Sequence, residues 1–218
     1  MLPGDLLMQK PISVQTLQRL PLYLHYMKSL PSDNSTFISA KALGNALNYG
    51  EIQVRKDLSA VSDGGKPKVG YSTAELIHDI ESYLGYNDVN DAVLVGTGKL
   101  GSALLSYEGF KAYGLNIVAA FDSDPEKCGK DGSGKQILPL DKLENMCRRM
   151  KIRIGIITVP SSSAQSVCDL LVKGGVEAIW NFAPTHLSVG DGVLLKNENM
   201  ASSLAVLSKH LSEKDRNI

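Results

Sequence analysis

Three glycines mark the part of the chain whose residue types and spacing indicate chemistry. Gly96, Gly98 and Gly101 have G-x-G-x-x-G spacing and lie between an apolar run at residues 92–95 and a helix-like apolar pattern. In such a turn the first glycine permits a tight bend, the second lets the backbone approach a pyrophosphate, and the third allows close helix packing. The motif therefore predicts a dinucleotide-binding turn made of Gly96, Thr97, Gly98, Lys99, Leu100 and Gly101.

Asp122 supports this prediction because it follows the next apolar run, residues 116–121, about twenty residues beyond the glycine turn. A carboxylate at this position accepts hydrogen bonds from the adenosine ribose and repels a 2′-phosphate. Its neighbour Ser123 supplies no cation that would attract such a phosphate. We therefore predict that the site holds NADH and NAD+ rather than their 2′-phosphorylated forms. The alternative is a glycine-rich turn beside an incidental aspartate.

An enzyme would also need a proton donor beside the nicotinamide. Tyr107 and Lys111 have the Y-x-x-x-K spacing in which a lysine assists a catalytic tyrosine. In short-chain dehydrogenases, however, this pair lies on a later helix, whereas here it closes the helix that follows the glycine turn. None of the four histidines stands in a recognisable acid-base arrangement. The sequence thus predicts no catalytic residue.

Composition restricts the class of protein further. Apolar residues make up 43% of the 218 residues and charged residues 21%, which is typical of a folded chain of two domains. The three cysteines are far apart and form no C-x-x-C motif, so we predict neither disulfides nor a metal site. Without a signal-peptide pattern or a long apolar run, the expected protein is cytoplasmic and not in a membrane.

The glycine turn and Asp122 must be positioned by the second half of the chain. Short apolar runs without polar alternation recur there between amphipathic helices, at residues 92–95, 116–121, 136–138, 153–159, 178–182 and 193–196. This pattern predicts an α/β domain of the Rossmann type, with a doubly wound parallel sheet covered on both faces. A last helix, residues 200–211, has one apolar face, which either packs on its own domain or contacts a partner.

The first half has helical spacing instead, with helices predicted at residues 14–30, 39–47, 51–61 and 73–84. The second and third have the length and the short turn of a helix-turn-helix. Their shared core is predicted to contain Ala42, Leu43, Ala46, Leu47, Ile52, Val54 and Leu58.

A basic, glycine-rich turn at residues 64–71 has the composition of a wing. Eight basic side chains stand against five acidic ones in residues 1–71. This modest excess is concentrated where a winged helix would meet DNA, as binding to a phosphate backbone requires. The predicted DNA-binding residues are Ser39, Gln53, Arg55, Lys56, Ser59, Lys66 and Lys68. A small helical dimerisation or lid domain with a solvated charged face is the alternative.

Several segments together resemble the Rex family of redox-sensing transcriptional repressors. They are RLPLYL at residues 19–24, QVRKDLS at 53–59, GY at 70–71, VGTGKLG at 95–101, AAFDSDPEK at 119–127 and NFAP at 181–184. The resemblance implies a homodimer that binds an A/T-rich inverted repeat in operator DNA when NAD+ prevails and leaves it when NADH accumulates. Its expected parts are a winged-helix domain at 1–85, a Rossmann domain at 86–198 and a helix and tail at 199–218, with the helix swapped between subunits.

The resemblance also implies which further residues form the sites. Near the nicotinamide it places Tyr107, Val159, Pro160, Asn181, Phe182, Ala183 and Pro184. At the dimer contact and switch it places His25, Asn199, Met200, Leu204, Leu207 and Leu211.

The chain departs from the family at the wing, which lacks the usual aromatic residues. His25 and Asn199 stand where an arginine and an aspartate often form an ion pair. A second hypothesis from the residues is an NAD(H)-dependent oxidoreductase with a small accessory domain.

Overall fold

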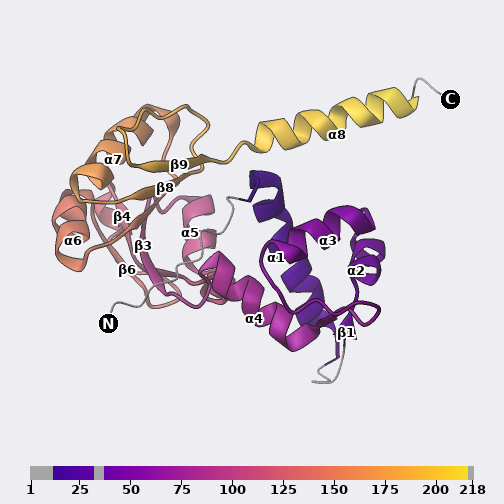
Figure 1. Cartoon of the computed structure of the whole chain (residues 1–218). Helices are drawn as coiled ribbons and strands as arrows, with labels where there is room; N and C mark the ends of the chain where they lie inside the picture. The colour runs from indigo at the N-terminus through magenta and orange to yellow at the C-terminus, as the bar shows by residue number, and fades with distance from the viewer. Residues whose placement is uncertain (1–11, 32–36, 216–218) are drawn as a thin grey trace, which may run out of the picture. The chain divides into compact units, whose positions relative to one another are not determined.

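The computed structural model describes residues 12–31 and 37–215 of the chain. The chain divides into two units, Met1–Asp88 and Val89–Ile218, and each is described by itself (Figure 1). The end of the predicted C-terminal tail, residues 216–218, lies outside the described residues.

The N-terminal unit is a winged helix, as the sequence predicted. Its elements are α1 (Val14–Ser29), β1 (Phe37–Ile38), α2 (Ala40–Leu47), α3 (Glu51–Ser59), β2 (Tyr71–Ser72) and α4 (Thr73–Leu84). The two short strands pair antiparallel, with Phe37 opposite Ser72 and Ile38 opposite Tyr71. This pairing, which was not among the predicted features, fixes the C-terminal end of the predicted wing at Tyr71.

Side-chain caps define the helix-turn-helix. The Ser39 hydroxyl accepts a hydrogen bond from the Ala42 N–H at 3.0 Å and begins α2. Asn48, with φ of 58°, ends α2 in the left-handed conformation that asparagine tolerates. The Ser72 hydroxyl likewise accepts from the Glu75 N–H at 3.5 Å and begins α4.

The predicted core of the helix-turn-helix is only partly correct. Leu43, Val54 and Leu58 are fully buried, and Leu47 is half-buried. The prediction is wrong for Ala42, Ala46 and Ile52, because all three side chains are exposed, that of Ile52 to 69%. Each of these short helices buries only one stripe at three- and four-residue spacing. In α3 that stripe passes through Val54, Asp57 and Leu58, which places Ile52 on the outer face.

Asp57 is buried because α1 surrounds its carboxylate with donors. Arg19 donates through Nε at 2.7 Å and Nη2 at 2.9 Å, Tyr23 Oη donates at 2.9 Å, and Thr16 Oγ1 donates at 3.0 Å. Burial opposes ionisation of Asp57, but the hydrogen bonds from Arg19, Tyr23 and Thr16 outweigh burial and lower the pKa of its carboxyl group. The charged network attaches α3 to α1 in one fixed orientation.

The C-terminal unit contains a seven-stranded sheet with the order β5-β6-β4-β3-β7-β8-β9. The strands are β3 (Asn90–Val95), β4 (Leu115–Asp122), β5 (Gly129–Lys130), β6 (Gln136–Pro139), β7 (Ile154–Ile157), β8 (Ala178–Asn181) and β9 (Leu194–Asn197). All neighbours are parallel except β5 and β6. Leaving out β5, which was not predicted, the order is that of a Rossmann fold, so the predicted fold class is confirmed.

Helices and 3-10 turns cover both faces of the sheet, as predicted. α6 (Leu143–Met150) and α7 (Ser161–Lys173) pack on the face that carries Val93 and Val95. α5 (Lys99–Leu105) and the 3-10 helix η1 (Glu108–Tyr113) pack on the face that carries Ala92 and Leu94. Two shorter 3-10 turns, η2 (Pro125–Lys127) and η3 (Leu140–Lys142), follow β4 and β6. The central strands are therefore apolar on both sides.

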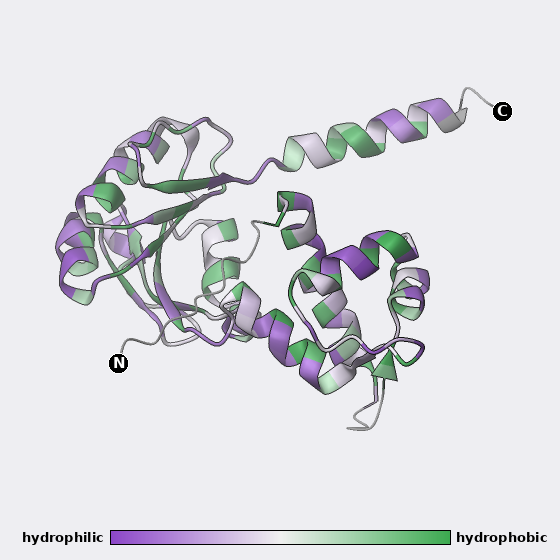
Figure 2. Cartoon of the chain, viewed as in Figure 1, coloured by the Kyte–Doolittle hydropathy of each residue, from purple (hydrophilic) through white to green (hydrophobic). Residues whose placement is uncertain are grey.

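The last helix, α8, runs from Met200 to Asp215, with hydrophobic and hydrophilic residues mixed along it (Figure 2). Met200, Leu204, Leu207 and Leu211 are 62–67% exposed. The helix therefore does not pack on its own unit, which was one of the two alternatives. In the part of the chain that the structure describes, no helix is long and apolar enough to cross a membrane.

Candidate nucleotide pocket and nucleic-acid interface

A pocket of about 670 Å³ lies at the carboxyl ends of β3, β4 and β7. The strand order reverses between β3 and β7, and open α/β sheets bind their ligands at such a point. Its walls come from the predicted turn, from the end of β4 and from loops after β6, β7 and β8. They are Val95, Gly96, Gly98, Leu100, Asp122, Ser123, Asp124, Lys127, Leu140, Thr158, Val159, Pro160, Ser163, Ser166, Val167, Phe182 and Pro184.

Glycine stands at each of the three positions of the turn for a different geometric reason. Gly96 has φ of +97°, a conformation that other residues rarely adopt. A Cβ on Gly101 would lie 1.8 Å from the carbonyl oxygen of Gly96, so only glycine lets α5 start this close to the turn. A Cβ on Gly98 would meet nothing within 4 Å, because this residue borders the open pocket. The turn thus leaves free the space that a pyrophosphate needs.

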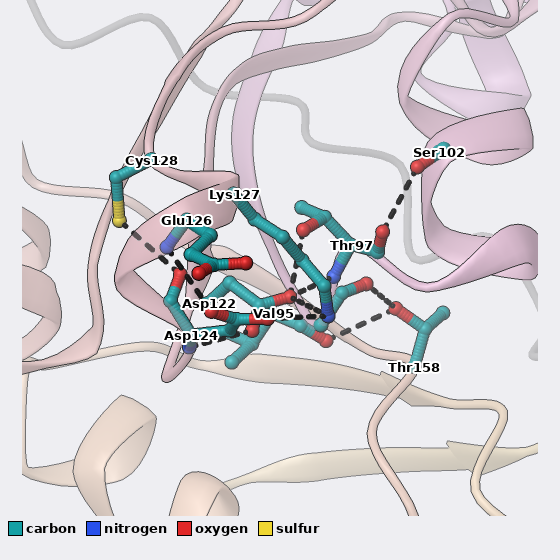
Figure 3. A network of polar contacts seen from close by, with 10 residues as sticks. Val95, Thr97, Ser102, Asp122, Asp124, Glu126, Lys127, Cys128 and Thr158 are labelled. Carbon is teal, nitrogen blue, oxygen red and sulfur yellow. Dashed lines mark hydrogen bonds and ion pairs between the residues drawn. The ribbon is translucent and has the colours of Figure 1, made fainter.

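Thr158 also shapes the turn, although it was not among the predicted site residues. Its hydroxyl lies 2.7 Å from the carbonyl oxygen of Gly96 and 3.0 Å from that of Val95, and donates to them (Figure 3). Strand β7 ends at Ile157, the residue before Thr158 and two residues earlier than predicted. No spacing rule marks Thr158, because the contact joins residues that are 62 positions apart.

Asp122 is buried and surrounded by donors (Figure 3). Its Oδ2 accepts from Thr97 N at 2.8 Å, Thr97 Oγ1 at 2.6 Å and Lys127 Nζ at 3.3 Å, and its Oδ1 accepts from Asp124 N at 3.0 Å. Burial disfavours the charged form, but the hydrogen bonds from Thr97, Asp124 and Lys127 outweigh it and lower the pKa of Asp122 to about 2. The carboxylate is ionised at neutral pH and has acceptor capacity left on Oδ1.

The opposite end of the pocket is mostly apolar and is formed by Val159, Pro160, Phe182 and Pro184. Asn181 does not line it. Its side chain is fully buried, and its amide donates to Ala183 O at 3.2 Å, to Thr185 O at 3.1 Å and to Asn197 Oδ1 at 2.8 Å. Asn181 therefore fixes the loop that presents Phe182.

Lys99, Ala183 and Tyr107 also lie outside the lining of this pocket. Tyr107 is 54% exposed, and its ring packs edge-on against Phe110 at 5.0 Å between centroids. Lys111 forms its ion pair with Glu108 at 2.6 Å. The structure therefore does not assemble a tyrosine-lysine pair at the nicotinamide end. Among the described lining residues there is no tyrosine or histidine.

Four of the predicted DNA-binding residues meet in one groove of the N-terminal unit, of about 520 Å³. The wing folds back on itself there, with Lys66 and Gly70 exchanging backbone hydrogen bonds at 2.8 and 2.9 Å. Lys66 Nζ also lies 5.8 Å from the centroid of the Phe37 ring, so β1 supplies an aromatic contact to the wing. The groove is lined by Ser39, Ala40, Lys41, Glu51, Arg55 and residues 65–71, among them Lys66 and Lys68.

The other predicted residues of α3 lie elsewhere. Gln53 and Lys56 line a second groove, of about 600 Å³, together with Ser13 and Thr16 of the α1 N-terminus. Ser59 is exposed, and its hydroxyl donates to the carbonyl of Lys56 at 3.1 Å. Arg55 lines the wing groove and is ion-paired with Glu51, which was not among the predicted DNA-binding residues. The outward face of α3 is thus divided between two grooves.

The predicted switch residues His25 and Asn199 are both exposed. The Asn199 side chain accepts a hydrogen bond from the Ser202 N–H at 3.0 Å and caps the start of α8. Cys128, Cys147 and Cys168 are free thiols. The described residues contain no group of His, Cys, Asp and Glu that could hold a metal ion.

Comparisons with known proteins agree with this architecture. A family model for a putative DNA-binding protein N-terminus matches residues 11–59, and one for a CoA binding domain matches residues 87–185. The redox-sensing transcriptional repressor Rex of Treponema denticola is 41% identical over 206 residues, which are 94% of this chain and 98% of that protein. The repressor of the same name from Bacteroides thetaiotaomicron is 38% identical over 90% of each chain.

Solved structures give the same result. The chain is similar to RSP, described as a Rex-family repressor, in complex with β-NAD+ and operator DNA, with a TM-score of 0.88 and 32% identity. This similarity covers 94% of this chain and 95% of RSP. For RSP in complex with β-NADH the TM-score is 0.84, the identity 31%, and the coverage 94% and 97%.

The fold and the pocket define a class of two-unit proteins in which a winged helix precedes a dinucleotide-binding Rossmann unit. Within that class, the chain belongs to the Rex family of redox-sensing transcriptional repressors.

Proposed function

We propose that this chain is a transcriptional repressor that binds operator DNA as a homodimer and leaves it when NADH occupies the Rossmann pocket. One observation carries the proposal. A glycine turn anchored on Asp122 and a wing groove lined by Arg55, Lys66 and Lys68 occur in one chain of the Rex family. NADH and NAD+ are ligands in this proposal and are not consumed.

The pocket favours the reduced nucleotide for a physical reason. Its nicotinamide end is formed largely by Val159, Pro160, Phe182 and Pro184. Removing the positive charge of an oxidised nicotinamide from water into such surroundings is unfavourable, whereas the reduced ring is neutral. This difference in affinity is what allows NADH to shift an equilibrium between two states of the dimer.

The homodimer rests on α8. Its apolar stripe, Met200, Leu204, Leu207 and Leu211, is exposed in the single chain and fits a swapped position on a second copy. Two recognition helices of such a dimer enter successive major grooves when they are about 34 Å apart. A dimer closed around NADH changes that separation, so DNA and NADH oppose each other reciprocally. His25 and Asn199 would meet across this contact.

The test is operator binding at fixed salt, measured by gel shift with an A/T-rich inverted repeat. We expect a complex that survives NAD+ and dissociates with NADH. Retention of full operator affinity under saturating NADH would refute the repressor mechanism. Turnover of NADH with a carbonyl compound, without salt-sensitive DNA binding, would instead favour an oxidoreductase.

Asp122→Ala tests the cofactor end of this proposal. Loss of a hydrogen bond to a charged group costs about 1.5–3 kcal/mol, so we expect NADH affinity to fall roughly 10- to 100-fold. The matched variant Thr97→Val removes one donor to Asp122 Oδ2 and retains the carboxylate, so its loss should be smaller. Calorimetric titration with NADH measures both. An unchanged NADH affinity in Asp122→Ala would show that Asp122 does not contact the ribose.

Arg55→Ala tests the DNA end. Arg55 lies in the wing groove, ion-paired with Glu51. An arginine side chain can make a bidentate contact with a guanine in the major groove. We expect the substitution to cost about 1–3 kcal/mol on the preferred operator and to relax its sequence specificity. Lys56→Ala, in the second groove, is the control and should weaken binding evenly on all sequences. The same even loss with Arg55→Ala would make Arg55 a phosphate contact.

A further inference from the structure

Lys127 brings a positive charge to the ribose end of the pocket. Its Nζ lies 3.3 Å from Asp122 Oδ2 and 3.9 Å from Asp124 Oδ2, at the end of η2 (Figure 3). The side chain is 44% exposed and is a lining residue. Among the described lining residues it is the only basic side chain. Ser123, the position at which a phosphate-binding cation was sought in the sequence, lies at the same end.

This lysine changes the charge balance of that end. Asp122 and Asp124 together carry two negative charges, and Lys127 neutralises one of them. A 2′-phosphate brings close to two further negative charges, so it meets two uncompensated carboxylates without Lys127 and one with it. The electrostatic discrimination against a 2′-phosphate is therefore weaker than Asp122 and Ser123 alone predict.

Hydrogen-bonding capacity points in the same direction. Asp122 Oδ2 already has three donors, so only Oδ1 retains room for a ribose hydroxyl. An ammonium group has three N–H donors, and in Lys127 they contact these two carboxylates at 3.3 and 3.9 Å, in a side chain that is half open to solvent. Lys127 can therefore turn a donor toward a group at the 2′ position without leaving Asp122.

We propose that Lys127 is a specificity-determining residue of the pocket, which sets how strongly the chain distinguishes NADH from its 2′-phosphorylated form, NADPH. The inference rests on the proposed function of the pocket as the NADH site. It concerns the ribose end only, because the nicotinamide, pyrophosphate and adenine groups of the two nucleotides are identical.

The experiment compares the dissociation constants of NADH and NADPH on the full chain. The sole tryptophan, Trp180, packs at 4.8 Å between ring centroids on Phe182, a lining residue, so its quenching reports both nucleotides. With Lys127→Met we expect the ratio of the NADPH dissociation constant to the NADH dissociation constant to rise about tenfold. Lys127→Arg should keep the ratio of the parent chain, and the effect should shrink with added salt.

Lys142→Met is the matched control, because Lys142 lies beside the pocket wall at Leu140, pairs with Asp141 and does not line the pocket. It removes the same charge and should leave the ratio unchanged. Both nucleotides are measured on one sample, so an inactive fraction of the protein affects both measurements equally and does not alter the ratio. The variant Lys127→Gln repeats the test with a second uncharged side chain.

Two results would overturn the inference. In the first, the ratio is unaltered in Lys127→Met and Lys127→Gln although NADH still binds. In the second, both nucleotides weaken equally, which would make Lys127 only a support for Asp122. If the parent chain binds neither nucleotide, the proposed function fails as well, and this outcome is distinct from the first two.

Discussion

Replacing Asp57 with alanine is expected to destabilise the N-terminal unit by about 3–5 kcal/mol, the usual effect of breaking a buried ion pair by removing one partner. Arg19 has a side chain that is 14% exposed, and in the variant it keeps its charge without the carboxylate that balances it. Tyr23 and Thr16 lose their acceptor as well. The expected result is a lower midpoint of urea unfolding and loss of operator binding at temperatures where the parent chain still binds.

Asp63→Ala is the control for this prediction, since Asp63 is an exposed carboxylate in the same unit. Its unfolding midpoint should match that of the parent chain within about 0.5 kcal/mol. If Asp57→Ala unfolded at the parent midpoint, the buried network would contribute nothing net to stability.

The pH dependence of the stability of this unit follows from the direction of the pKa shifts of Asp57 and Tyr23. The folded pKa of Asp57 is lowered, so its contribution is fully present above the ordinary pKa near 3.8 and is lost as the pH falls below it. Burial and the hydrogen bond with Asp57 raise the pKa of Tyr23, so its contribution is lost as the pH rises above about 10. Asp57→Ala should therefore show a weaker acid dependence of unfolding than the parent chain.

The sequence predicted those features that depend on local patterns. The glycine turn, Asp122 and the alternation of strands and helices all follow from spacing within about thirty residues. The starts of α2 and α4 were predicted to within one residue for the same reason, because a serine at an N-cap bonds to a backbone N–H three residues away.

What the sequence did not predict depends on contacts between distant segments. Ile52 was placed in the core, because its apolar type gives no sign that Asp57 occupies the buried stripe with Arg19, 38 residues away. Asp122 was predicted to accept hydrogen bonds from a ribose, but its spacing did not indicate that Thr97 and Lys127 already donate to its Oδ2. Tyr107 has the Y-x-x-x-K spacing to Lys111, but in the fold Lys111 forms an ion pair with Glu108.

The second large effect is expected from Gly101→Ala, which should make the repressor less sensitive to NADH. The new Cβ would lie 1.8 Å from the carbonyl oxygen of Gly96 and 2.8 Å from Thr158 Oγ1. The backbone at Gly96 cannot shift aside as easily as the end of a flexible side chain, so α5 must move away from the turn. Overpacking of this kind costs about 1–3 kcal/mol, and we expect NADH affinity to fall roughly 5- to 150-fold.

Gly98→Ala separates the two roles of the turn. Its Cβ would meet no atom within 4 Å in the chain alone, so the stability of this variant should equal that of the parent. The same Cβ would nevertheless occupy space that a pyrophosphate approaches, so NADH affinity should still fall. Gly190→Ala, also in open space but outside the pocket lining, should alter neither quantity.

Operator binding distinguishes a failed sensor from an unfolded chain. The altered position lies in the C-terminal unit, and the residues that line the wing groove all lie in the N-terminal unit. Gly101→Ala should therefore bind the operator with parent affinity when NADH is absent and remain bound at NADH concentrations that release the parent chain. Normal release of Gly101→Ala by NADH would contradict the assignment of this turn as the site that controls DNA binding, because the altered backbone could not then be the surface that NADH contacts.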